Sequence, residues 1–270
     1  MIIEQKDLVL KQAKVLKLSQ YKDVYQIPGE NGKPFILKRF KGWAKIHCYN
    51  NASYTLHALK LLSRTLSSAT VPTWAELGED DVSVKMEFLP GLATGRPVFP
   101  ADYRFYHRFF SELYQLPSIP EWIKNIRSSQ VIPAHILNRI PDTQPMALGF
   151  KGDAWLNLLL QDQRLILADV EDLCLEPLGL SEAVAILDMT TAATSANFRA
   201  LRGLFALQQI KPAFANQLTI AQATLVIELA RQIWETRLVH CGSIRKWCKL
   251  KIADWLIVKL LAKLRSGALQ

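Results

Sequence analysis

Three oxygen-bearing side chains in the middle of the chain have the types and the spacing that phosphoryl transfer requires. Asp153 and Asn157 precede a short apolar run at residues 158–160, and Asp169 follows a second run at residues 165–168. Two such runs joined by a polar turn are typical of a β-hairpin, which brings all three side chains to one end of its strands. A carboxylate there orients an attacking hydroxyl, while an amide and a second carboxylate hold Mg²⁺ against nucleotide phosphates. The alternative is a surface hairpin with acidic ends.

A lysine with a buried stem is expected earlier in the chain. Residues 14–19 and 23–27 alternate apolar and polar side chains, which predicts two strands, and residues 28–32 form a dense turn signal. The strand that follows, residues 34–40, carries Lys38 after three apolar residues and two positions before Phe40, so its stem is expected to be at least half buried. The functional interpretation is a lysine that contacts nucleotide phosphates. The alternative is a lysine whose head extends into solvent at the end of a strand.

The other expected elements divide the chain near Pro90 and Gly91. One helix and two strands complete the first half (residues 52–66, 74–78 and 83–89). Helices dominate the second half, on apolar spacing of three to four residues (102–116, 134–140, 178–190, 197–209, 220–240 and 244–265). We therefore predict an α+β fold with two domains, a β-rich nucleotide-binding domain at residues 1–89 and a larger helical domain with the hairpin at residues 90–270.

The composition excludes several classes of protein. Half of the 270 residues are hydrophobic and 21% are charged, as in folded globular proteins. The four cysteines and five histidines lack metal-ligand spacing, so neither a zinc site nor a disulfide framework is expected. No apolar run approaches the roughly 18 residues of a membrane span, and the first residues are charged where a signal peptide is apolar. We expect a cytoplasmic protein whose net charge of +9 favours an anionic partner.

The order of these features resembles the protein-kinase-like phosphotransferases. Within them it is most similar to the bacterial lipopolysaccharide-core kinases and the related toluene-tolerance-type family. The similarity is carried by GKPFILKRF at residues 32–40, by NASY and LKLL in the first helix (51–54 and 59–62), and by ADVEDL at 168–173. It implies a two-lobed fold and an ATP- and Mg²⁺-dependent kinase that phosphorylates a sugar hydroxyl of the lipopolysaccharide core.

The resemblance also implies a role for each candidate residue. Asp153 is the catalytic carboxylate, and Asp188 braces its loop from a following helix. The nucleotide is bound at the phosphates by Lys38 and at the adenine by the backbone around Glu87 and Leu89. Mg²⁺ is held by Asn157 and Asp169, with Asp172 or Glu171 as a further acid.

The sequence departs from the family pattern at four places. Lys151 stands where a histidine is usual before Gly-Asp, and Asn157 follows Asp153 by four positions instead of about five. The segment at residues 19–23 contains no glycine, so its backbone approaches phosphates less freely. The helix that supplies a glutamate to the lysine in this family offers Thr55 or His57.

These departures define the alternatives. A buried lysine without its glutamate should have a lowered pKa, and Lys151 is either a cation that neutralises the transferring phosphoryl group or a solvated loop residue. The departures favour a pseudokinase, a binding module that retains the fold without turnover. A soluble small-molecule phosphotransferase of the aminoglycoside or choline type is the nearest enzymatic alternative. No recognition helix or stacking motif supports a nucleic-acid partner.

The C-terminal segment, residues 244–265, is basic and amphipathic. It contains seven lysines and arginines against one acid, Asp254, and four aliphatic side chains share one helical face (Ile252, Leu256, Leu260 and Leu264). Such a helix can lie on an anionic membrane surface, which would place the protein peripherally on the inner membrane beside a lipid-linked saccharide. Otherwise it packs on the helical lobe with its basic face in solvent.

Overall fold

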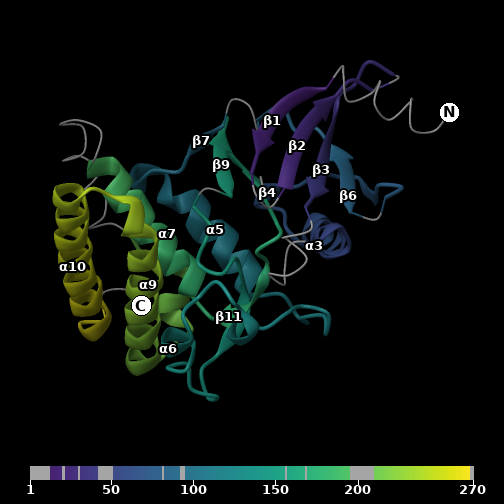
Figure 1. The fold of residues 1–270 in the computed structure, drawn as a ribbon. Coiled ribbons are helices and arrows are strands. Elements are labelled where there is room, and N and C mark those ends of the chain that lie inside the picture. The colour runs from purple at the N-terminus through teal and green to yellow at the C-terminus, as the bar shows by residue number, and fades with distance from the viewer. Residues whose placement is uncertain are drawn as a thin grey trace.

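The computed structural model of the protein describes most of the chain. The described residues are 13–19, 22–29, 31–41, 51–80, 82–91, 95–155, 157–167, 169–194 and 210–267. The helix expected at residues 197–209 lies outside them. Figure 1 shows a twisted sheet at one end of the molecule and the C-terminal helix α10 at the other.

The sheet near the N-terminus has five antiparallel strands in the order β1-β2-β3-β6-β5. Their bounds are Lys14–Leu18 for β1, Lys22–Ile27 for β2, Phe35–Phe40 for β3, Ala75–Leu77 for β5 and Ser83–Glu87 for β6. All five match strands predicted from the sequence, of which β1 and β2 were predicted from alternating apolar residues. The central strand β3 pairs with β2 and β6 on its two sides, so Lys38 is held by strand pairing from both directions.

Helix α3, Ala52–Thr65, packs on this sheet against β3, β5 and β6. It begins at Asn51, whose side-chain oxygen accepts the backbone N–H of Tyr54 at 2.6 Å, a typical N-cap. Its leucines at three- and four-residue spacing are buried, as the periodicity predicts. The hydroxyl of Tyr54 donates to the carbonyl of Leu173 at 2.5 Å. Helix α3 is thereby tied to the segment that follows Asp169.

The predicted hairpin is confirmed as β9, Leu158–Gln161, and β10, Arg164–Leu167. Asp162 and Gln163 form its turn with φ of 48° and 64°. Two consecutive positive φ values give the turn type whose twist matches that of paired strands. The hairpin lies within a second sheet of order β4-β10-β9-β7, in which β4 is Ala69–Thr70 and β7 is Arg96–Pro97.

The rest of the chain is mostly helical. Its α-helices are α5, Tyr103–Tyr114; α6, Ala134–Leu137; α7, Leu180–Thr194; α9, Ile220–Thr236; and α10, Ser243–Arg265. Short 3-10 helices are η1, Pro100–Asp102; η2, Ile126–Ser128; η3, Ala213–Asn216; and η4, Arg237–His240. Strands β8, Met146–Gly149, and β11, Cys174–Pro177, pair with each other. None of the described helices is long and apolar enough to span a bilayer.

Two C-terminal expectations are refined by the structure. The helix expected over residues 220–240 ends as α-helix at Thr236 and continues as η4, so Arg237 lies where the helix tightens. Helix α10 packs on α7 and α9. Leu256, Leu260 and Leu264 are buried in this contact. The aliphatic face of the basic segment is therefore part of the core, because it covers the neighbouring helices.

Candidate active site

Two lysines project from one face of the N-terminal sheet. Lys38 on β3 pairs with Val24 on β2, and Lys22 lies two residues before Val24. Because side chains alternate along a strand, Lys22 and Lys38 point to the same side. Both are buried, with 7% and 5% of their surface exposed. Lys22 lies within the glycine-free segment at residues 19–23, where β2 begins, so a second cation accompanies the one that the sequence singled out.

Both lysines bind the same two carboxylates, which follow strand β10. Lys22 Nζ lies 2.5 Å from Asp169 Oδ2 and 2.9 Å from Glu171 Oε1. Lys38 Nζ lies 2.9 Å from Asp169 Oδ1 and 3.0 Å from Glu171 Oε1. We call these four side chains the lysine–carboxylate cluster. Its two positive and two negative charges balance, which is the condition for keeping ions in a buried place.

The electrostatics of the lysine–carboxylate cluster favour an ionised Asp169. Burial alone raises the pKa of this carboxyl group, but the charges of Lys38 and Lys22 outweigh it and lower the pKa to about 2. Burial lowers the pKa of Lys38, and the charge of Asp169 opposes that shift. The direction agrees with the sequence-based expectation for Lys38. The expectation that Lys38 would be unpaired is wrong, because Asp169 and Glu171 supply the carboxylates that helix α3 lacks.

The catalytic candidate Asp153 lies on the loop that leads into β9. Its side chain is 44% exposed and approaches Arg237 NH1 at 3.4 Å. The side-chain nitrogen of Asn157 donates to the backbone carbonyl of Asp153 at 2.7 Å, which closes the short loop between them. The four-residue spacing thus forms a compact turn stabilised by its own amide.

Arg237 also joins Asp153 to the acid that was expected to brace this loop. Its guanidinium lies 3.5 Å from Asp188 Oδ2, and its NH2 donates to the Lys151 carbonyl at 3.5 Å. Trp234 donates its indole N–H to Asp188 at 3.0 Å. Burial raises the pKa of Asp188 to about 6. Asp188 therefore reaches the loop through an arginine from η4, which no local sequence pattern pointed to.

The backbone before Asp153 is held in an uncommon conformation. Lys151 and Gly152 have φ of 48° and 72°, in the left-handed region that a residue with a side chain rarely adopts. The N–H of Gly152 donates to Ser181 Oγ at 3.0 Å and to Glu176 Oε2 at 3.3 Å. Burial raises the pKa of Glu176 to about 7. The buried side chains of Glu176 and Ser181 thus hold this turn through hydrogen bonds to its backbone.

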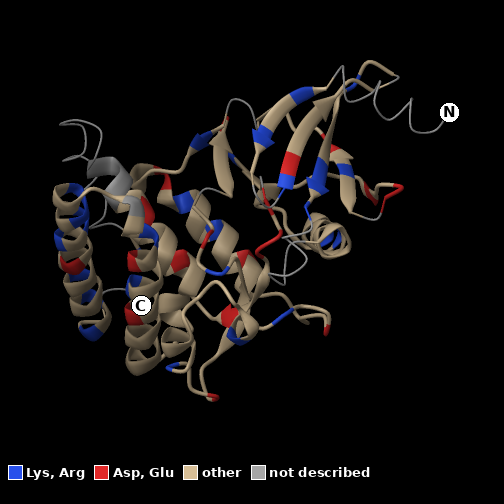
Figure 2. Cartoon of the chain, viewed as in Figure 1, with Lys and Arg blue, Asp and Glu red and all other residues tan. Residues whose placement is uncertain are grey.

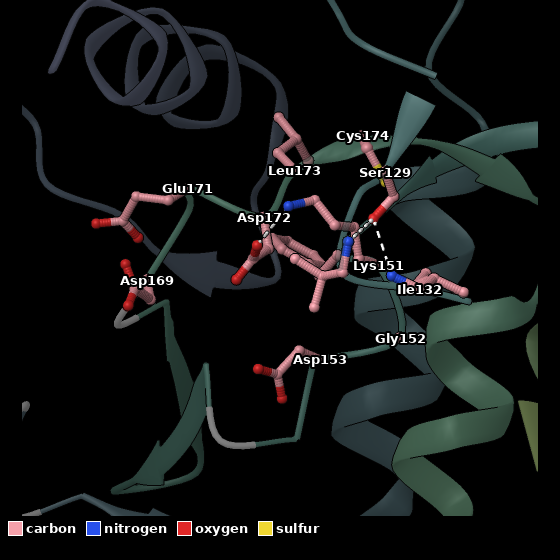
Figure 3. A network of polar contacts seen from close by, with 12 residues as sticks. Ser129, Ile132, Lys151, Gly152, Asp153, Asp169, Glu171, Asp172, Leu173 and Cys174 are labelled. Carbon is pink, nitrogen blue, oxygen red and sulfur yellow. Dashed lines mark hydrogen bonds and ion pairs between the residues drawn. The ribbon is translucent and has the colours of Figure 1, made fainter. Parts of the chain in front are cut away.

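Lys151 and Asp172 form a pair of their own. Lys151 Nζ lies 2.8 Å from Asp172 Oδ1, and the lysine side chain is 8% exposed. Figure 3 shows this pair on one side of the loop, with Asp169 and Glu171 on the neighbouring strand exit and Asp153 on the loop that enters the hairpin. Lys151 is therefore not a solvated loop lysine. The proposed metal role of Asp172 stays a prediction.

The segment expected to bind adenine leaves strand β6. The backbone N–H of Glu87 donates to the Trp74 carbonyl at 3.2 Å, and its carboxylate accepts from the backbone N–H and the hydroxyl of Thr73. Within the described part of the chain the N–H of Leu89 makes no backbone hydrogen bond. Of the two positions, Leu89 retains the donor that an adenine ring requires.

The oxygens near Asp169 fit a divalent metal bound together with phosphates. Glu171 Oε2 is buried and has no hydrogen-bond partner among the described residues, and Asn157 uses its nitrogen and not its oxygen to close the loop. Ionised Asp169 completes a set of hard oxygen donors. The described residues contain no group of three or more His, Cys, Asp or Glu side chains arranged as a metal cage. Such a set suits Mg²⁺, which usually keeps waters and phosphate oxygens as ligands.

Sequence reasoning missed Lys22 and Arg237, and it treated Glu171 only as a further acid. Lys22 could have been found from the strand register. Once β2 is paired with β3, Lys22 and Lys38 lie on the same face of the sheet. Arg237 had no such signal, since it lies 84 residues beyond Asp153. The hairpin pairs Leu158 with Leu167, so the residues that precede β9 and follow β10 lie at one end of the strands, as predicted. The structure also brings Lys38 to Asp169, a contact that the sequence reasoning did not name.

Comparison with solved structures identifies the fold. No protein-family model and no curated protein sequence matches the chain. Its structure is similar to an amicoumacin kinase in complex with AMP-PNP, Ca²⁺ and amicoumacin, with a TM-score of 0.55, 14% identity, and coverage of 96% of this chain and 93% of that one. A microcompartment-associated aminopropanol kinase gives a TM-score of 0.53 at 13% identity, over 99% and 98% of the two chains.

An ethanolamine kinase of Plasmodium vivax gives a TM-score of 0.53 at 10% identity, with coverage of 95% of this chain and 87% of that one. All three structures are small-molecule kinases with a protein-kinase-like fold. The chain therefore has this α+β fold, with a strand-rich N-terminal part and a helical C-terminal part, as the sequence predicted.

Proposed function

We propose that this chain is an ATP- and Mg²⁺-dependent phosphotransferase that phosphorylates a hydroxyl group of a small molecule. The observation that carries the proposal is the convergence of Lys22 and Lys38 on Asp169, at the exit of the hairpin whose entrance carries Asp153. This arrangement supplies cations for phosphates, an ionised carboxylate for a metal and a second carboxylate for the acceptor.

In this proposal Lys38 and Lys22 bind the nucleotide phosphates, and the Leu89 N–H contributes to adenine binding. Asp169, Asn157 and the unpaired oxygen of Glu171 would hold Mg²⁺, which neutralises phosphate charge when bound. Asp153 orients the acceptor hydroxyl and accepts its proton as the oxygen attacks the γ-phosphorus, while the bond from that phosphorus to the bridging oxygen breaks and ADP leaves. Arg237 holds the Asp153 carboxylate in place, because it is anchored on Asp188.

Three of the four departures from the family pattern have counterparts in the geometry. Glu171 takes the position of the missing helix glutamate beside Lys38, and Lys22 adds a side-chain cation where the segment at residues 19–23 has no glycine. Lys151 is fixed by Asp172. These contacts support an intact site over a degenerate one.

The acceptor is proposed at two levels of detail, a general class of compound and a specific one. The fold similarity to an aminopropanol kinase and an ethanolamine kinase supports a small hydroxyl compound. The finer assignment, a sugar hydroxyl of a lipid-linked saccharide in the lipopolysaccharide core, rests on the resemblance of residues 32–40 and 168–173 to that family.

A binding module without turnover is the second candidate. It is favoured by one observation, that both oxygens of Asp169 are already bound by lysines, so the lysine–carboxylate cluster is neutral without any ligand. In that case no acceptor would be phosphorylated, whether or not the chain binds a nucleotide.

The decisive experiment measures ADP release from Mg·ATP with amino alcohols, aminoglycosides and core saccharides as acceptors. Asp153→Asn should lower kcat by at least about a hundredfold, the usual contribution of a positioned general base. Asp162→Asn is the matched control, because Asp162 is an exposed aspartate at the turn of the same hairpin. Equal activity in both variants would refute the role of Asp153, and binding of Mg·ATP without any acceptor-dependent turnover would favour the second candidate.

A further inference from the structure

Helix α10 has two different apolar faces, and only one of them is covered. Ala253, Leu256, Leu260 and Leu264 are buried against the neighbouring helices. The opposite face is exposed along the whole helix. In Figure 1 α10 forms the outer edge of the helical part, with α9 beside it.

The exposed face carries large apolar side chains. Ile244 is 82% exposed, Trp247 61%, Trp255 39% and Val258 64%. Their spacing of three, eight and three residues places them on one stripe, because each interval is close to a whole number of helical turns. Scattered exposed apolar residues need no explanation, but four along one stripe of one helix form a patch. This stripe is distinct from the aliphatic face that the sequence pattern emphasised.

Four exposed basic side chains are spread along the same helix, about one for every two turns. Arg245, Lys251, Lys259 and Arg265 are exposed together with the stripe. The only acid of the helix, Asp254, is bound by Arg231 of helix α9 at 3.1 Å. Figure 2 shows α10 at the rim of the molecule with several blue segments and one red segment along it. The face therefore presents a net positive charge without an unpaired acid.

This combination distinguishes between possible occupants. A dry protein interface disfavours lysines at its centre, and Lys251 lies between the two tryptophans. A lipid interface accommodates both groups, because tryptophan rings sit at the headgroup level and lysines extend to the phosphates. Anionic headgroups match the uncompensated positive charge.

We propose that the exposed face of α10 binds the surface of an anionic lipid bilayer. Trp247, Trp255 and Val258 enter the headgroup region while Lys251 and Lys259 contact lipid phosphates. The helix lies parallel to the surface, because its other face remains packed on α7 and α9. This inference is independent of the proposed phosphotransferase activity.

The test is flotation of the full-length protein with vesicles of phosphatidylcholine alone or mixed with phosphatidylglycerol. The wild type should float with the mixed vesicles and not with phosphatidylcholine alone. Trp247→Ser combined with Trp255→Ser should weaken binding by roughly tenfold, because it removes the largest interfacial side chains. Trp74→Ser is the control, since Trp74 is 45% exposed on the N-terminal sheet. Thermal unfolding should be unchanged in each variant.

A second pair of variants tests the charge without touching the tryptophans. Lys251→Glu with Lys259→Glu should abolish flotation, a loss greater than about tenfold. Lys60→Glu with Arg64→Glu changes the net charge equally at exposed positions of α3 and should have no effect. The proposal is overturned if the wild type binds vesicles of phosphatidylcholine alone as well as the mixed vesicles. It is also overturned if both pairs of charge variants lose flotation equally. A protein that does not float but dimerises with increasing concentration, and whose dimer the tryptophan variants abolish, would overturn it as well.

Discussion

The lysine–carboxylate cluster and the loop around Asp153 lie at the same end of one hairpin, after its second strand and before its first, yet they are built in opposite ways. The cluster buries four charges that compensate one another, with Glu171 only 2% exposed. The loop around Asp153 exposes 44% of that side chain and is held by hydrogen bonds and ion pairs that involve Glu176 and Asp188, whose pKa values burial raises. This contrast fits the proposed roles, in which the cluster binds the charged nucleotide and the exposed carboxylate receives the acceptor.

This difference predicts how each region responds to change. Removing a charge from a buried, balanced set leaves its partners uncompensated, whereas removing an exposed charge is tolerated by water. Stability should therefore depend on the lysine–carboxylate cluster, and turnover on the loop.

The largest effect is expected from Glu171→Gln. This change leaves Lys22 and Lys38 buried with Asp169 alone, so the free energy of unfolding should fall by about 3 kcal/mol. Asp153→Asn should change it by less than about 1 kcal/mol, because that carboxylate is half exposed. Chemical denaturation of both variants measures the two values. Similar losses in the two variants would contradict the contrast between the regions.

Acidification should affect the two regions in opposite directions. The pKa of Glu176 rises from 4.5 to about 7 in the fold, so its contribution to stability is fully present below pH 4.5 and is lost as the pH rises towards 7. The slope is on the order of 1 kcal/mol per pH unit for one group. The pKa of Asp169 falls from 3.8 to about 2, so its contribution is present above pH 3.8 and is lost as the pH falls towards 2.

Denaturation midpoints measured between pH 4.5 and 7 check this expectation. Glu176→Gln should flatten the profile in that window, while Glu182, whose pKa is also raised to about 7, preserves part of the slope. An unchanged profile in Glu176→Gln would show that this acid does not titrate as the buried position requires.

Lys22→Met should weaken Mg·ATP binding by roughly tenfold, the effect of one desolvated charge-assisted contact. Adenosine, which lacks phosphates, should bind the variant and the wild type equally. Lys33→Met is the matched control, because Lys33 is exposed in the turn between β2 and β3. Isothermal titration gives the affinities. A loss of adenosine binding in Lys22→Met would indicate a structural rather than a phosphate-binding role.

The smallest effect concerns the turn that joins the two regions. Gln163 is exposed with φ of 64°, so Gln163→Gly should raise the free energy of unfolding by about 0.5 kcal/mol. Gln163→Ala should not, because alanine has the same steric conflict as glutamine. Denaturation of the two variants side by side tests whether the hairpin limits stability.

Local patterns were enough to predict the N-terminal sheet and the hairpin, but not strands β4, β7, β8 and β11. Alternating apolar residues defined β1 and β2, and polar turns marked β3 and the hairpin of β9 and β10, because these signals depend on neighbouring residues. Asp153, Asn157 and Asp169 were therefore found together on the hairpin, and Lys38 was found separately on the third strand. The partners that complete the site were harder to predict from the sequence. To place Lys22 beside Lys38 one must know the strand register, and to place Arg237 beside Asp153 one must know how α9 packs against α7.

The C-terminal helix illustrates the same limit. Its aliphatic face was evident from the spacing of Leu256, Leu260 and Leu264, but the sequence could not say whether protein or lipid covers that face. The structure places it against α7 and α9. Only with that face occupied does the second stripe of Trp247 and Trp255 stand out, because its exposure depends on tertiary contacts.

The most direct test of the account is titration of Mg·ATP into the wild type, Lys38→Met and Asp153→Asn. The account predicts that the wild type binds, that Lys38→Met loses most of the affinity, and that Asp153→Asn binds as the wild type does. Absence of binding to the wild type, or undiminished binding to Lys38→Met, would contradict the assignment of the lysine–carboxylate cluster as the nucleotide site.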